Sequence, residues 1–224
     1  MRAFLASAIL CFTLAACNTV NTSSGSDTDA QIVVNKAEDV VDRFLVSPQA
    51  NAIEGLLSSA KGVIIYPDIV KAAFFVGGEG GTGVLLGRLD DGSWSSPAFY
   101  TFGAASYGLQ IGAEQSNLLL VITNERTLER LTEGGLEFGA DVSVATGAEG
   151  LKSGVSSDQF QDIYSFVEVE RGLFAGLNLK GAKALPRDGL NRAYYGASVT
   201  PRDIVIDGST DNPAAADLKA ALAR

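Results

Sequence analysis

The sequence predicts an α+β fold: a curved antiparallel β-sheet or half-open barrel, preceded by two amphipathic helices and followed by a short C-terminal helix. Three observations predict it. Apolar residues recur every three or four positions near the beginning of the chain. They then alternate with polar residues, or form short continuous runs, along many segments. Glycine accounts for 25 of the 224 residues and often lies inside these segments, which is typical of strands that bend.

The first residues have the pattern of a secretory signal. Arg2 precedes an uncharged apolar run that ends at Ala16, shorter than the ~20 residues that a membrane-spanning helix needs. The run ends in Leu-Ala-Ala-Cys, which resembles the bacterial lipobox, in which the cysteine is acylated. We therefore expect a lipoprotein signal peptide (residues 1–16), an acylated Cys17 with a flexible tether (17–30) and a single domain (31–224). An ordinary signal peptide cleaved near Ala16 is the alternative.

Two amphipathic helices are expected next, over residues 31–44 and 48–60. Their apolar positions recur at helical spacing and are expected to face the core, and Ser47 and Pro48 are of types that cap and begin helices. These positions are Val33, Ala37, Val40, Val41 and Phe44 in the first helix, and Ile53, Leu56, Leu57 and Ala60 in the second.

From residue 62 onward the pattern is that of strands. They are expected at residues 63–66, 71–76, 83–89, 98–102, 107–113, 118–123, 136–144, 163–169 and 173–179. Asp90, Asp91 and Gly92 indicate a hairpin turn. Short helices are expected over residues 124–133 and from Asn212 to Leu222. A glycine-rich loop is expected between two of the strands, formed by Gly77, Gly78, Gly80, Gly81 and Gly83.

Composition excludes several classes of site. The sequence has no histidine, and its two cysteines, Cys11 and Cys17, precede the folded part. A histidine-dependent triad, a Cys/His zinc site and an internal disulfide are therefore excluded there. The 17 basic and 26 acidic residues give a net charge of −9, which argues against a nucleic-acid partner. Removal of residues 1–16 would leave 16 basic and 26 acidic residues, or −10.

Two motifs resemble catalytic or cofactor sites without meeting their requirements. Residues 78–83 match G-x-G-x-x-G, but strand-like residues follow where a dinucleotide site needs a helix, which favours a structural loop. Ser106 lacks the first glycine of a nucleophile elbow and any histidine to activate it. We expect no enzyme activity, cofactor or metal. The aromatic residues are expected in the core rather than on a lipid-facing surface: Trp94, Phe99, Tyr100, Phe102 and Phe174.

Several blocks, in order, resemble the SYLF domain, a lipid-binding family also catalogued as a yeast actin-binding or actin-regulator domain. The blocks are residues 60–67, 71–72, 75–84, 91–97, 108–112 and 171–176, with Asn191, Tyr195 and Gly196, and the resemblance extends over about residues 31–206. It implies binding without catalysis: relatives bind phosphoinositides and other anionic lipids, and some bind actin. The sequence departs from the pattern of these relatives at residues 145–150 and at Lys180. These departures bear on which lipid headgroup it would prefer.

Together with the lipobox, the resemblance implies a lipid-anchored, periplasm-facing module that binds anionic phospholipids. Asn18, directly after the acylated cysteine, favours the outer membrane. The cations within or beside the matched blocks are the headgroup candidates: Lys61, Lys71, Arg88 and Arg171. Ordinary solvated charges are the alternative for each of them. The alternative for the whole chain is a structural lipoprotein or one that binds an envelope protein, with no lipid ligand besides its own acyl anchor.

Overall fold

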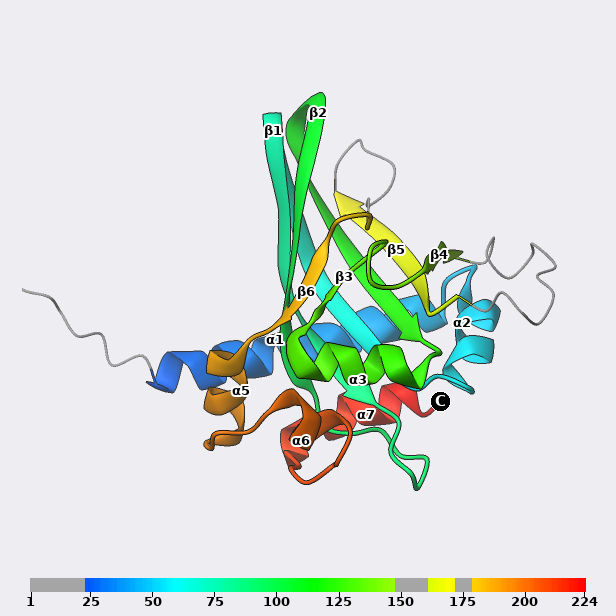
Figure 1. The fold of residues 1–224 in the computed structure, drawn as a ribbon, viewed down its shortest axis with the longest axis vertical. Coiled ribbons are helices and arrows are strands. Elements are labelled where there is room, and N and C mark those ends of the chain that lie inside the picture. The colour runs from blue at the N-terminus through cyan, green and yellow to red at the C-terminus, as the bar shows by residue number, and fades with distance from the viewer. Residues whose placement is uncertain (1–22, 148–160, 172–178) are drawn as a thin grey trace, which may run out of the picture.

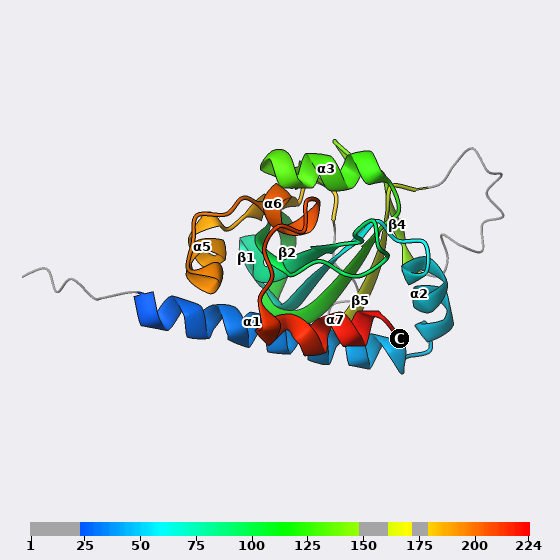
Figure 2. The same ribbon diagram turned by 90° about the horizontal axis from the view of Figure 1, so that it is seen from below.

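The computed structural model describes residues 23–147, 161–171 and 179–224, apart from the side chains of residues 23–27, 72–76, 106–113 and 171. The predicted signal peptide, Cys17, Asn18 and Phe174 lie outside the described residues. Within them the fold is α+β, as the sequence predicts. A curled six-stranded sheet forms a half-barrel, and helices cover both of its faces (Figures 1 and 2).

The centre of the sheet is a long hairpin of β1 (Gly62–Gly87) and β2 (Ala98–Ile122). The two strands pair antiparallel from Gly62 opposite Ile122 to Leu85 opposite Ala98. The predicted turn between them is confirmed: the amide of Leu89 donates to the carbonyl of Ser93 at 2.9 Å, and Gly92 has a φ of +83°. Figure 1 shows β1 and β2 rising together beyond the helices, at the top of the view.

β1 doubles back on itself. The Lys71 ammonium lies 2.9 Å from a carboxylate oxygen of Glu79, so the reversal falls between these two residues. At the other end, the amide of Arg88 donates to the carbonyl of Lys61 at 2.8 Å, although 27 positions separate the two residues. A straight strand of this length would instead hold its two ends about 80 Å apart. The residues just before and just after β1 are therefore neighbours.

The expected glycine loop is wrong, because its five glycines lie inside β1, at or after the reversal. Two of them are needed where the second part of β1 packs closely on the first. A Cβ at Gly83 would lie 2.2 Å from the carbonyl oxygen of Ile65, and one at Gly81 would lie 3.3 Å from the Cα of Ile69. Both contacts are tighter than ordinary van der Waals packing, so a side chain at these positions would separate the two parts of the strand.

β2 reverses together with β1, so the first and last parts of β2 pair with different strands. Its first part pairs with β6 (Lys183–Pro186), which pairs with β3 (Leu136–Glu137). Its last part pairs with β5 (Ile163–Arg171), which pairs with β4 (Val144–Thr146). β4 runs parallel to β5, where we expected only antiparallel pairing. The strand expected at 136–144 is divided between β3 and β4, and most of the strand expected at 173–179 lies outside the described residues.

The two N-terminal helices are present with shifted beginnings. α1 (Ser23–Leu45) begins before residue 31, so residues 23–30, expected in the tether, are helical. α2 (Ala50–Leu57) begins two residues after Pro48, because Pro48 lies in the turn between the helices, where the Ser47 hydroxyl accepts the amide of Gln49 at 3.2 Å. The buried stripe of α1 comprises Ala30, Val34, Ala37, Val40, Val41 and Phe44, with Val33 only partly buried beside it.

Apolar cores lie on both faces of the sheet, which explains the continuous apolar runs of its strands. On one face, Val63 and Ile65 pack with α1, α2, α5 (Asp188–Tyr195) and α7 (Ala216–Leu222). On the other, Ile64 and Tyr66 pack with α3 (Glu125–Gly134) and α6 (Pro201–Val205). Figure 2 shows the sheet between these two groups of helices.

The described aromatic residues confirm the predicted core placement. The residues Trp94, Phe99, Tyr100 and Phe102 are at most 3% exposed. The helix expected at 124–133 is confirmed as α3, with Asn124 as its N-cap. The C-terminal helix is also confirmed: Asn212 caps a short 3₁₀ turn (Pro213–Ala215) that leads into α7. The sequence did not predict α5, α6 or β6.

Candidate functional site

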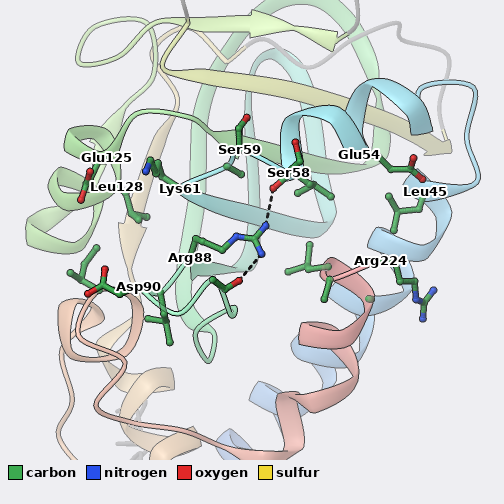
Figure 3. Close-up of a pocket in the computed structure, with 18 of the residues that line it drawn as sticks. Leu45, Glu54, Ser58, Ser59, Lys61, Arg88, Asp90, Glu125, Leu128 and Arg224 are labelled. Atoms are coloured by element: carbon green, nitrogen blue, oxygen red, sulfur yellow. Dashed lines mark hydrogen bonds between the residues drawn. The ribbon is translucent and has the colours of Figure 1, made fainter.

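The structure brings together two of the four predicted headgroup residues. Lys61 directly precedes β1 and Arg88 directly follows it, and the reversal of β1 places them side by side. Both line a cavity of about 750 Å³. Its wall is formed by the end of α2, the β1–β2 connection, α3, the residue after α6 and the C-terminal end of α7 (Figure 3). Sequence separation concealed this pairing, and only the fold of β1 creates it.

Arg88 lies at the centre of the cavity (Figure 3). Its guanidinium donates to the carbonyl of Leu57 at 2.8 Å and to that of Gly92 at 3.0 Å. It also lies over the ring of Trp94, 3.9 Å from the centroid. Burial lowers the pKa of Arg88, but an arginine in a protein remains charged. Leu57 is the last residue of α2, so this positive charge also complements the negative end of the helix.

Both cations lack an acidic partner within the described part of the chain. Lys61 is exposed and forms no ion pair there. Arg88 uses two of its N–H groups on backbone carbonyls, which are neutral acceptors. Within the described residues, two positive charges therefore border the same cavity without forming an ion pair with a carboxylate. Apolar side chains adjoin them in the wall: Leu45, Leu57, Leu89, Leu128, Ile206 and Leu222. An anionic group attached to an apolar body would find matching surfaces there.

Lys71 does not join this site. It lies in β1 beside the reversal and forms an ion pair with Glu79, whose side chain is only 2% exposed. Glu114 of β2 lies opposite Lys71 in the register and is also buried. Burial raises the pKa of Glu114, and the nearby Lys71 charge opposes this rise. Lys71 therefore compensates buried carboxylates within the sheet instead of lining the cavity.

The remaining predicted residues are not part of the cavity wall as described. Arg171 ends β5, where it pairs in register with Gln115, and its side chain lies outside the described residues. The five glycines lie in β1, as described above. Ser106 lies within β2, and its side chain is likewise not described.

The sequence did not indicate a second, smaller cavity of about 280 Å³ between α1 and the sheet. Both of its cations are neutralised within the protein: Lys36 pairs with Asp68, and Arg43 pairs with Glu168 at 2.9 Å and with Glu170. Burial would raise the pKa of Asp68, but hydrogen bonds from Lys36 and Gln115 lower it overall. This network fastens α1 to the sheet and leaves little free charge for a ligand.

The described residues provide neither a metal-binding cluster nor a membrane-spanning helix. Those residues include no group of three or more Asp, Glu, Cys or His side chains arranged to hold a metal ion. Of the helices in the described ranges, none is both long and apolar enough to cross a membrane.

Comparison with known proteins identifies the family. Residues 103–224, more than half of the chain, match the family model Ysc84, described as "Las17-binding protein actin regulator". The chain belongs to the Ysc84 (SYLF) family. Human SH3 domain-containing YSC84-like protein 1 is 33% identical to it over 165 residues, which cover 72% of this chain and 47% of the relative. Protein YSC84 of Saccharomyces cerevisiae is 30% identical over 167 residues, covering 72% of this chain and 35% of the relative.

The chain thus spans about half or less of the length of these Ysc84-family relatives. The family model begins within β2 and therefore includes α3, α5, α6 and α7, whereas Lys61 and Arg88 precede it. The cavity wall therefore combines residues that lie inside the matched region with residues that precede it.

The structure also explains the last residues on which the SYLF resemblance was based. Asn191 is fully buried in α5, and its side-chain oxygen accepts the amide of Phe99 at 2.7 Å. The Tyr195 hydroxyl donates to the carbonyl of Pro97 at 2.8 Å, and Gly196 ends α5 with a φ of +65°. In this Ysc84-family member these residues join α5 to the beginning of β2, which is a structural role.

Proposed function

We propose that this chain is a non-enzymatic lipid-binding module tethered to a membrane of the bacterial envelope, and that the cavity beside Lys61 and Arg88 receives the phosphate of a phospholipid. The observation that carries this proposal is that Lys61 and Arg88, neither of which forms an ion pair in the described part of the chain, border one cavity together with several apolar side chains. Phosphate binds well to such a pair, because arginine offers a planar set of donors and lysine a mobile point charge. Anionic phospholipids are the ligand class expected from the SYLF resemblance.

The proposed tether is the acylated Cys17, with the domain facing the periplasm from the outer membrane. Acyl chains contribute ~0.8 kcal/mol for each methylene group that enters the bilayer, so two or more chains would hold the protein without a spanning helix. The domain itself carries a large negative charge, which opposes approach to an anionic surface. Screening limits that repulsion to about 8 Å at physiological salt, so a local site can still bind.

A protein-binding role is the second candidate, and the description of the family favours it. The family is described as a Las17-binding actin regulator, and the relatives are SH3 domain-containing proteins. In a bacterial envelope the corresponding role would be binding to another envelope protein, with Cys17 as the sole membrane contact. Such a chain would capture a partner from delipidated envelope extracts and would bind vesicles no better than a variant without the Lys61 charge.

Vesicle flotation separates the two candidates. The full chain with Cys17→Ser, which cannot be acylated as a thioether, serves as the parent, so that contacts by residues 1–16 are common to every variant. Lys61→Gln is compared with Arg192→Gln, a matched loss of one exposed charge on α5, which contributes no residue to the cavity. One basic residue near a membrane contributes about 1 kcal/mol, or about a fivefold change in partitioning.

We expect Lys61→Gln to lower flotation with phospholipid vesicles about fivefold, and Arg192→Gln to leave it nearly unchanged. Equal effects of the two substitutions would show that the charges act without a site and would refute the proposal. If neither the parent nor either variant floated with the vesicles, the protein-binding role would be favoured.

A further inference from the structure

The wall of the cavity carries negative as well as positive charges. Glu54 of α2, Asp90 of the β1–β2 connection, and Glu125 and Glu129 of α3 all line it. None of these carboxylates has an ion-pair partner in the part of the chain that the structure describes. In Figure 3, Lys61 and Glu125 lie on one side of Arg88, and Glu54 lies on the other. Opposite charges thus share one cavity without pairing with each other.

Several charges elsewhere in the described protein do form ion pairs. Lys71 pairs with Glu79 and Arg43 with Glu168, each at 2.9 Å. Even Arg224, a third cation in the cavity wall, is neutralised by Asp42 at 2.7 Å. A ligand that carried only negative charge would be attracted by Lys61 and Arg88 but repelled by the four carboxylates. A ligand with both signs would satisfy both sets of groups.

The residues of the cavity wall also indicate which kind of positive group a ligand would carry. A quaternary ammonium is recognised by a cage of aromatic rings, but the described residues that line the cavity include no aromatic side chain. A primary ammonium instead needs hydrogen-bond acceptors. The carboxylates provide them, as do Ser58 and Ser59, whose hydroxyls donate to backbone carbonyls and keep their own lone pairs free.

We propose that the cavity selects a zwitterionic phosphate ester with a primary ammonium group, the chemistry of the phosphoethanolamine headgroup. The phosphate lies between Lys61 and Arg88, and the ammonium lies against the carboxylates of α3 and the hydroxyls after α2. This inference rests on the proposed function for the source of the ligand, a membrane phospholipid. It changes the expected preference from an anionic lipid to phosphatidylethanolamine.

The test uses the full chain with Cys17→Ser and three kinds of vesicle: phosphatidylcholine alone, and phosphatidylcholine mixed with either phosphatidylethanolamine or phosphatidylglycerol. We expect the phosphatidylethanolamine vesicles to bind most tightly. Glu125→Gln combined with Glu129→Gln should lower that binding at least fivefold without lowering binding to phosphatidylglycerol. Glu133→Gln, which removes one charge, is the control on the same helix, because Glu133 is exposed there but does not line the cavity.

Soluble glycerophosphoethanolamine identifies the source of the ligand. Competition by it, but not by glycerophosphocholine, supports the inference and the lipid source together when vesicles also bind. Binding of the soluble compound without any vesicle binding supports the headgroup chemistry and refutes the lipid-binding function. Preference for phosphatidylglycerol, with loss on Lys61→Gln, refutes the inference and leaves the proposed function intact. Binding to none of these probes refutes both.

Discussion

Replacing Gly83 by alanine tests whether close packing of the two parts of β1 maintains the fold. The added methyl group would lie 2.2 Å from the carbonyl oxygen of Ile65 and 2.4 Å from a ring carbon of Tyr66. Overpacking a core costs about 1–3 kcal/mol, and occasionally more. Because the first obstacle here is backbone, which cannot rotate away, we expect a loss of about 3 kcal/mol or more in the free energy of unfolding. For a chain of this size that corresponds to a fall in Tm of roughly 6–12 °C.

Gly103→Ala in β2 is the matched control, because its Cβ would have no atom within 4 Å. An alanine there restricts the unfolded chain and relieves the glycine penalty, so we expect a change between zero and about 1 kcal/mol of added stability. Chemical denaturation and thermal unfolding of both variants measure the two effects. If Gly83→Ala unfolded at the same denaturant concentration as Gly103→Ala, the two parts of β1 would not be in the contact that we describe.

Three further predictions concern stability. Arg88→Gln should lower the free energy of unfolding by about 1–3 kcal/mol, because two backbone carbonyls and a tryptophan ring lose their cation. Urea denaturation measures this loss, and an unchanged denaturation midpoint would contradict the prediction. Asn191→Ala should lower it by about 1–3 kcal/mol by leaving the buried amide of Phe99 without an acceptor, and hydrogen exchange should become faster at that amide. The pKa of Asp211 is lowered, chiefly by the hydrogen bond from Ser96. The ionised carboxylate therefore contributes its full stabilisation of the fold above the ordinary pKa of 3.8, and this stabilisation is lost as the pH falls through the pKa of Asp211 in the folded protein. Asp211→Asn should therefore flatten the decline of stability in acid, and an equally steep decline in both proteins would contradict this assignment.

The sequence predicted the elements with strong periodicity and missed those whose signal was short. α1 and α3 have apolar stripes over several turns, and both were correctly predicted as helices. α6 has only five residues, so it has no periodicity to detect, although the capping box of Thr200 and Asp203 with Pro201 between them was a readable signal. The early beginning of α1 was concealed because its first turns consist of polar residues that also suit a linker.

The site was less predictable than the fold, because it depends on how β1 returns. Apolar alternation indicates strands, but it does not indicate where a strand reverses. The five glycines between residues 77 and 83 suggested a loop, whereas they lie within β1, where Gly81 and Gly83 allow close packing after the reversal. The resemblance singled out Lys61, Lys71 and Arg88 alike, since all three lie in or beside the matched blocks. Only the positions of their partners distinguish a lysine that neutralises buried Glu79 from two cations that border a cavity.

The register of β1 and β2 also determines the order in which this protein can assemble. Leu85 and Ala98 are 13 positions apart, whereas Gly62 and Ile122, at the other end of the same ladder, are 60 apart. Closing the short loop first and adding pairs outward is the entropically cheaper route, so pairing should spread from the Gly92 turn. The contact between Lys61 and Arg88 then forms only after β1 has doubled back. We therefore expect the cavity to be among the last parts of the native structure to form during folding.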